Sequence, residues 1–555
     1  MLGNETVSIE EFKKLVSKKT KLVKFKNQFV LLNPDEAEKL LSQFEKKLSR
    51  FDVLQNVLDE TIVADEKTKL CFENFFHVNE LEPPKNLNAH LRPYQLHGFS
   101  WMYANIKNGF GCLLADDMGL GKTIQVLSLL LFLKQTNELH DKTNGALIVC
   151  PASLLSNWKH ECVLFSKALS CEEYHGAKRK LKNADIILTT YQTLQIDSEK
   201  LKNEKFAFVI LDEAQAIKNA ETKNAKAVKN LKSNFRLALT GTPIENNLED
   251  LRSIFDFILP TFLGDEKSFR EKFRIPIELH GDKNVSRSLN KITAPFILRR
   301  LKTDKKIISD LPEKIVANEY CNLTKVQASL YDALVQSELQ QVFNADSKIK
   351  RSARIFKLLT SLKQICNHPK AYDENESEDA NLSGKMMRLL EIAKQSLESG
   401  EKILIFSQYV ETLNLLQNAI EKNLRAECLQ ITGKQNLKTR TENVERFQTN
   451  VHNRILLVSL KAGGTGLNLT KANHVIHYDL WFNPAVEDQA TDRAFRIGQT
   501  QNVFVTRLIS EGTFEEQIDK MIFQKRNLAG TLQAGETWIS KLSNDELKEI
   551  VNLRK

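Results

Sequence analysis

The sequence lacks any apolar run long enough to cross a bilayer, and its first residues show no secretory apolar core. A membrane span needs about 18–20 consecutive apolar residues, and no uninterrupted run approaches that length. From Asn4 to Lys14 the N-terminus carries charged and polar residues where a secretory apolar core would stand. These absences predict a cytoplasmic protein without a membrane partner.

Paired cysteines are also missing. The eight cysteines stand singly, with no C-x-x-C pair, which argues against a zinc ribbon or a disulfide framework and fits a reducing compartment. Cys366 and His368 are close in sequence, but two candidate ligands do not make a metal site. A packed thiol at Cys366 is the favoured interpretation.

The composition shows no bias that would exclude a globular fold. A hydrophobic fraction of 42% and a charged fraction of 27% are ordinary for a globular chain, and 555 residues correspond to about three to four domains. The net charge of +9 favours a polyanionic partner. This signal is weak because the basic residues are spread along the whole chain.

A phosphate-binding loop is the strongest chemical signal present. The stretch ADDMGLGKT (115–123) follows an apolar run, Cys112 to Ala115, and precedes the apolar stretch Ile124 to Leu133. A strand, a glycine-rich turn and a helix opening with Lys-Thr point successive N–H groups at one anion. Asp116 stands where the generic pattern has glycine. The alternative is an ordinary strand–helix turn.

The residues of this loop have separate expected roles. Gly119 and Gly121 let the backbone curl around phosphates. Lys122 would reach the β- and γ-phosphates, and Thr123 would hold magnesium through its hydroxyl. The loop therefore predicts a nucleotide and Mg²⁺ as ligands.

A pair of acids supplies the second chemical signal. The apolar run Phe206 to Leu211 ends at Asp212-Glu213, and a carboxylate delivered beside a phosphate loop is the usual second magnesium contact. Glu213 would orient and deprotonate the attacking water. The alternative is two solvated acids at a strand end.

Alternating strand and helix patterns predict an α/β fold. Small or polar residues repeatedly follow the apolar strands, which places ligands along the carboxyl edge of a parallel sheet. The predicted strands are 146–150, 184–188, 206–211 and 237–239, then 403–406, 428–431, 455–458 and 474–477. Residues 1–84 carry no catalytic signature. There we expect a helix over 9–16, one half-exposed strand over 22–32 and a helix over 37–51.

Three side chains outside the loop are further candidates. The Gln95 amide could both donate to and accept from adenine, although alone it is more often a surface residue. Arg493 and Arg496 are three residues apart, so on a helix they face the same way. Two arginines aimed at a cleft can stabilise charge on a γ-phosphate. Their alternative is a surface salt-bridge face.

Taken together, the motifs resemble the bacterial type of Swi/Snf-family DNA-dependent ATPases, within superfamily two of the helicases. The resemblance runs from Leu91 to about Leu532 and rests on LRPYQ, ADDMGLGKT, LDEAQ, LTGTPIEN, LRRLKTD, QICNHP, SLKAGGTGLNL and NPAVEDQATDRAFRIGQ. Asp116 is normal for this family. Gln215 replaces its common His, and we expect activity to survive that change.

The resemblance implies two RecA-like P-loop NTPase lobes with ATP and Mg²⁺ between them. Gly464 and Gly466 match the loop that links the nucleotide to DNA in this family. The matching DNA-binding positions are Ser153, Asn157, Trp158, Thr190, Gln408, Thr432, Lys461 and Trp481. The predicted parts are an accessory module (1–84), lobe 1 (85–320, with a helical insertion at about 248–300), a helical insertion with a flexible acidic linker (321–385), lobe 2 (386–502) and a brace with C-terminal helices (503–555).

The resemblance further implies an ATP-driven translocase on double-stranded DNA that remodels or displaces bound proteins without separating strands. A strand-separating DNA or RNA helicase, a nucleotide-gated DNA-binding scaffold and a subunit of a defence complex stay open as alternatives. The client also stays open among RNA polymerase, repair, and plasmid or phage defence. We also expect the protein to be cytoplasmic and associated with the nucleoid, and to bind a complex partner through residues 1–84.

Overall fold

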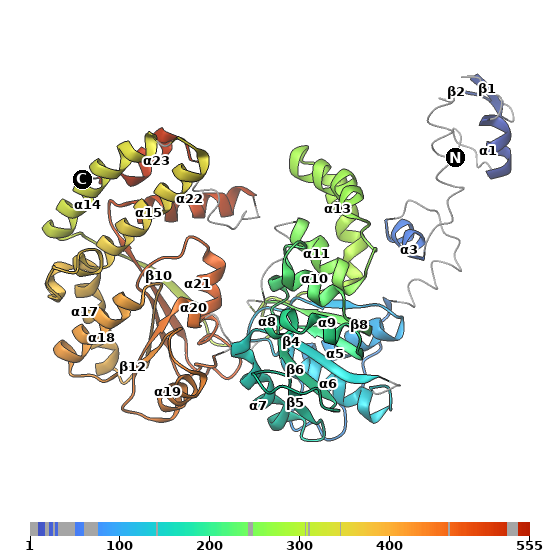
Figure 1. Cartoon of the computed structure of the whole chain (residues 1–555), viewed down its shortest axis with the longest axis horizontal. Helices are drawn as coiled ribbons and strands as arrows, with labels where there is room; N and C mark the ends of the chain where they lie inside the picture. Colours follow the sequence, from blue (N-terminus) through green and yellow to red (C-terminus); the bar gives the residue numbers. More distant parts are fainter. Residues whose placement is uncertain are drawn as a thin grey trace. The chain divides into compact units, whose positions relative to one another are not determined.

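The computed structural model describes residues 9–16, 22–25, 28–31, 50–59, 76–139, 143–241, 248–302, 304–305, 307–308, 311–344, 346–463, 467–529 and 542–554. The chain divides into two units. One joins Met1–Asn74 with Thr261–Pro295, and the other joins Phe75–Pro260 with Phe296–Lys555. Figure 1 shows the elements of both.

The first unit combines N-terminal elements with part of the predicted insertion. Helix α1 (Ile9–Val16) has the predicted bounds. The single strand expected over 22–32 is instead an antiparallel hairpin of β1 (Leu22–Phe25) and β2 (Gln28–Leu31). An alternating pattern does not reveal such a break, because each arm of a hairpin keeps the alternation. The helix expected over 37–51 lies outside the described residues except for its last two.

The other described elements of this unit are helices. It contains α3 (Arg50–Leu58), α12 (Glu266–Phe269), the π-helical η3 (Arg270–Leu279) and α13 (Lys283–Thr293). Phe51 meets Phe262 edge to face at 5.5 Å between ring centroids, so residues some two hundred positions apart share one small apolar contact.

The first lobe of the larger unit is a parallel sheet of seven described strands in the order β5-β6-β4-β7-β8-β3-β9. Its interior strands are apolar and buried on both faces, as parallel strands covered by helices require. The strands are β3 (Cys112–Leu114), β4 (Asn144–Cys150), β5 (Cys171–Glu173), β6 (Ile186–Thr190), β7 (Lys205–Leu211), β8 (Lys232–Leu239) and β9 (Ile297–Leu298). The main helices are α5 (Pro93–Lys107), α6 (Lys122–Gln135), α7 (Leu155–Phe165), α8 (Tyr191–Ile196), α10 (Lys223–Lys229) and α11 (Leu248–Ile258).

The second lobe is a parallel sheet of six described strands in the order β10-β15-β14-β11-β13-β12. Its strands are β10 (Lys314–Cys321), β11 (Ile403–Ser407), β12 (Cys428–Ile431), β13 (Ile455–Ser459), β14 (His474–His477) and β15 (Val503–Ser510), with helices α17 (Gly384–Glu398), α18 (Val410–Leu424), α19 (Leu437–Thr449) and α21 (Pro484–Thr491) between them. The predicted α/β class with two lobes is confirmed.

The second sheet extends beyond the residues 386–502 predicted for it. Strand β15 pairs with both β10 and β14, so it belongs to this sheet and not to a brace. Strand β10 escaped prediction because it is an edge strand whose apolar residues, such as Val316 and Tyr320, are half exposed. Such a strand carries no clean periodicity.

A helical cluster stands beyond one end of this sheet (Figure 1). Helices α14 (Lys325–Phe343), α15 (Lys348–Asn367), α22 (Phe514–Ala529) and α23 (Asn544–Val551) share one apolar core. The insertion and the C-terminal helices therefore form a single structural element.

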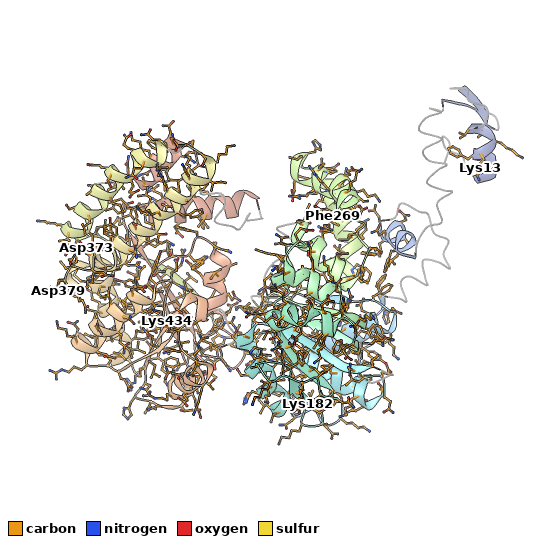
Figure 2. The ribbon with its side chains drawn as sticks, viewed as in Figure 1. Lys13, Lys182, Phe269, Asp373, Asp379 and Lys434 are labelled. Carbon is orange, nitrogen blue, oxygen red and sulfur yellow. The ribbon has the colours of Figure 1, made fainter. Side chains whose placement is uncertain are left out.

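The acidic run expected to be a flexible linker is folded against the second lobe. The Lys370 ammonium donates to the Glu374 carbonyl (2.6 Å), and the His368 ring hydrogen-bonds the Asp379 carbonyl (3.1 Å). Figure 2 shows Asp373 and Asp379 close together at the margin of this lobe. Local turn hydrogen bonds outweigh the like-charge repulsion suggested by the composition.

None of the described helices is long and apolar enough to span a membrane. The described cysteines are free thiols, and Cys366 is fully buried, as predicted for a packed thiol.

Candidate active site

The phosphate loop joins β3 to α6. Gly119 (φ +88°) and Gly121 (φ +75°) adopt left-handed backbone conformations that favour glycine. Lys122 folds back onto the loop, where its ammonium donates to the carbonyls of Asp116 (2.6 Å) and Asp117 (3.2 Å). Burial lowers the pKa of Lys122, although the acids around it oppose the shift. The loop thus holds a partly buried cation at a helix N-terminus, as an anion site requires.

Asp116 is built into the fold. Its buried carboxylate accepts from Arg300 Nε (2.8 Å), pairs with Arg300 Nη2, and accepts from Gln125 (3.3 Å). Arg300 also bonds the Tyr94 carbonyl. The aspartate that stands in place of glycine therefore links the phosphate loop to the segment that follows β9.

Strand β7 delivers the acid pair to the same edge. The Trp158 indole N–H donates to Asp212 Oδ2 (2.8 Å), and the Glu213 N–H donates to Asp212 Oδ1 (2.9 Å). Burial, followed by the charge of Glu213, raises the pKa of Asp212 to about 6, while the Trp158 hydrogen bond opposes this rise.

Gln215 connects the acid pair to the end of β8. Its amide donates to Glu213 Oε2 (2.7 Å) and accepts from Thr240 Oγ1 (3.0 Å). Glu213 itself has a left-handed backbone (φ +52°), a conformation that is uncommon for a residue other than glycine. Thr240 therefore fixes one end of the Gln215 amide, and the other end holds the Glu213 carboxylate.

The two arginines lie just beyond α21, not on it. The helix ends at Thr491, and Arg493 and Arg496 follow in a turn, so the argument that they face one side of a regular helix is wrong. They nevertheless reach the phosphate loop. Arg493 Nη2 lies 3.7 Å from the Met118 sulfur, and a Cβ added to Gly119 would come within 2.6 Å of Arg496 Cβ.

Glu161 is a site residue that the sequence motifs did not predict. It lies on α7, one turn beyond Asn157, whose amide donates to Glu161 Oε1 (2.9 Å). Burial raises the pKa of Glu161, and both the Thr123 hydroxyl and the Arg496 charge oppose this rise. The spacing of Trp158 and Glu161 on one helix face was the available signal.

Gln95 is buried against the phosphate loop. Its amide nitrogen donates to the Leu120 carbonyl (3.2 Å), and its oxygen accepts from the Arg92 N–H (3.0 Å). The described structure therefore places Gln95 beside the loop with both amide groups bonded to backbone.

The residues predicted to contact DNA lie mostly at the carboxyl ends of strands. Ser153 follows β4, Thr190 ends β6, Gln408 follows β11, Thr432 follows β12 and Trp481 follows β14. Trp158 and Asn157 differ from this pattern, because Trp158 is only 1% exposed and both side chains bond to acids of the nucleotide site. The buried Trp158 indole, whose N–H is taken by Asp212, is not placed to contact DNA in this structure. Gly464, Gly466 and the Lys461 side chain lie outside the described residues.

Helix α15 supports the strand ends of the second lobe. The Lys363 ammonium donates to the Leu480 carbonyl (2.7 Å), which also accepts from the Gln408 amide (2.7 Å). Lys363 Nζ lies 3.6 Å from the centre of the Phe482 ring. Residues on both sides of Trp481 are therefore held by one buried lysine.

Comparison with known proteins decides the family. Residues 94–371, half of the chain, match the SNF2-related domain, and residues 384–498 match the helicase conserved C-terminal domain. The chain belongs to the Swi/Snf family. Residues 1–58 match a further family described as SNF2 Helicase protein. The predicted Swi/Snf-type, helicase-like ATPase class is confirmed at the level of the family.

Individual relatives are longer than this chain. A protein of Bacillus subtilis (strain 168) named "Putative ATP-dependent helicase/translocase YwqA" is 37% identical over 580 residues, covering 98% of this chain and 62% of the relative. TATA-binding protein-associated factor MOT1 of Saccharomyces cerevisiae is 32% identical over 550 residues, covering 85% and 29%. The chain thus spans less than two thirds of either relative.

A solved structure is also similar. The Sulfolobus solfataricus SWI2/SNF2 ATPase core in complex with dsDNA is 45% identical to this chain, with a TM-score of 0.44. The match covers 86% of this chain and 100% of the solved one.

Proposed function

We propose that this chain is the motor of an ATP-dependent translocase on double-stranded DNA, which remodels or displaces protein–DNA complexes without separating the strands. One observation carries the proposal: the phosphate loop of the first lobe meets the arginine-bearing turn of the second lobe at Met118 and Gly119. An ATPase that needs arginines from a second lobe has a chemical step that depends on the placement of that lobe.

The residues present fit ATP with magnesium. The curled backbone at Gly119 and Gly121, together with Lys122, would bind the β- and γ-phosphates. Thr123 and Asp212 would hold Mg²⁺, and its charge would neutralise part of the phosphate charge. No cluster of three or more His, Cys, Asp or Glu that could hold a metal by itself occurs among the described residues. Magnesium shared between phosphates and two side chains suits such a site.

The chemical roles then follow from contacts. Glu213, held by Gln215, would orient the attacking water and accept its proton. Arg493 and Arg496 would stabilise the charge that develops on the γ-phosphate, because they lie beside the loop that binds it. Gln95, packed on the same loop, would contact the base.

Strand-end groups of both lobes would track DNA phosphates. Small polar side chains and backbone N–H groups bind phosphates without reading sequence. The set proposed for this role is Ser153, Thr190, Gln408, Thr432 and Lys461, while Trp481 would stack or wedge against the duplex. RNA polymerase or another DNA-bound protein is the proposed client, which would place the motor at the nucleoid.

ATP turnover with duplex DNA, single-stranded DNA and RNA tests the proposal, with Lys122→Ala as the inactive control. Duplex DNA should stimulate turnover most, and triplex displacement should follow while strand displacement should not. Stimulation mainly by single strands or RNA, or efficient strand displacement, would replace the translocase with a helicase. An absence of turnover on every nucleic acid would contradict an ATPase motor.

A further inference from the structure

Lys302 stands between the phosphate loop and the arginine-bearing turn. It belongs to the segment that follows β9, and this segment forms two hydrogen bonds with Asp117. The Asp117 N–H donates to the Arg300 carbonyl (3.0 Å), and the Lys302 N–H donates to Asp117 Oδ2 (3.1 Å). The backbone at Lys302 is therefore fixed to the loop that would bind phosphate.

The side chain of Lys302 reaches the other lobe. Its ammonium forms an ion pair with Asp492, donates to the Phe495 carbonyl (3.2 Å) and lies 4.9 Å from the centre of the Phe495 ring. The side chains of Lys302 and Asp492 are only 7% and 12% exposed. A buried, hydrogen-bonded pair has a restricted geometry, whereas an exposed pair can exchange its partners with water.

The two groups that Lys302 holds flank the arginines. Asp492 directly precedes Arg493, and Phe495 directly precedes Arg496. We propose that Lys302 is a positioning residue that sets Arg493 and Arg496 relative to the phosphate loop, so that one side chain links nucleotide binding in the first lobe to the chemical step. This inference rests on the proposed ATPase function.

Loss of the link should slow chemistry more than it weakens ATP binding. Arginine contacts that strengthen in the transition state act mainly on kcat, and a misplacement of about 1 Å can cost about a hundredfold. We therefore expect Lys302→Met to lower duplex-stimulated kcat by about tenfold to a hundredfold. The KM for ATP and the affinity for a fluorescent ATP analogue should stay within about twofold.

Lys314→Met is the matched control. Lys314 pairs at 3.5 Å with Asp488, which lies on α21 four residues before Asp492, but both partners of this pair are more exposed. This variant also removes one lysine from a Lys–Asp pair near the end of α21, and it should leave kcat unchanged. Lys302→Arg should restore part of the lost kcat, since it keeps the charge.

A double-mutant cycle decides between outcomes, using Lys302→Met, Asp492→Asn and both together. Equal losses in the single variants, with no further loss in the double variant, would support the link. Additive losses, or a kcat for Lys302→Met equal to that of Lys314→Met, would overturn it. If Lys302→Met fails to fold, Asp492→Asn carries the same comparison from the other partner. A wild-type chain without any turnover would contradict the proposed function, which is a different result from an active wild type with an unaffected Lys302→Met.

Discussion

At the scale of single residues, Asp116 departs from the generic phosphate-loop motif, and the fold requires this departure. Replacing it by glycine would restore the common phosphate-loop pattern but would leave the buried Arg300 guanidinium without its carboxylate. Loss of one partner of a buried pair costs about 3–5 kcal/mol. We expect Asp116→Gly to lower the thermal midpoint strongly, and Asp116→Gly with Arg300→Met to lower it less. A melting point for Asp116→Gly close to wild type would contradict this account.

Gln215 offers a second residue-level prediction. Because its amide bonds both Glu213 and Thr240, Gln215→Ala should release Glu213 and lower duplex-stimulated kcat roughly tenfold, within the usual range for a misplaced general base. Gln215→His places the family's common side chain there and serves as the control, with activity retained. Steady-state turnover at saturating ATP and DNA measures both. Equal activity of the alanine and histidine variants would remove the proposed role of this amide.

At the scale of elements, α15 buries a lysine whose protonation should affect stability. Burial lowers the pKa of Lys363 to about 8, so between pH 8 and its ordinary pKa of 10.5 the unfolded chain binds the proton that the folded chain lacks. Wild type should therefore gain stability relative to Lys363→Met as pH rises through this window, by at most about 1.4 kcal/mol per pH unit. Thermal midpoints at pH 7.5 and 9.5 measure the gap.

The same helix provides the control for that experiment. Lys357 is exposed and pairs with Glu338 on the surface, so Lys357→Met should follow wild type at both pH values. Parallel profiles for Lys363→Met and wild type would mean that folding does not lower the pKa of Lys363.

Prediction from sequence succeeded for elements with a local signal. The apolar strands β12 and β14 have the predicted bounds, and the phosphate loop and the acid pair lie at strand ends as expected. It failed where a partner distant in sequence decides the outcome. Strand β15 joins the second sheet because β10 and β14 flank it, and the Trp158 indole on α7 donates to Asp212, which follows β7 and lies 54 positions further along the chain. The local sequence pattern predicts neither contact.

At the scale of the whole molecule, the net charge of +9 should make DNA binding depend on salt. Binding through phosphates releases counterions, so the logarithm of affinity should fall linearly with the logarithm of salt concentration, with a slope of about −0.9 for each phosphate contacted. The half-saturating duplex concentration for ATPase stimulation, measured between about 50 and 200 mM salt, tests this. An affinity that does not change with salt would exclude phosphate contacts as its main source.

The packing of α22 and α23 with α14 and α15 has a consequence for synthesis on the ribosome. Strand β10 and the two helices after it emerge before the rest of the second lobe, whereas β15, α22 and α23, which complete their sheet and their core, emerge after it. Until then, β10 lacks its only neighbour in the described sheet, and the apolar faces of α14 and α15 stay open to water. The second lobe should therefore depend on chaperones during translation, and a premature stop before β15 should yield an aggregating product even though the phosphate loop and its sheet are complete.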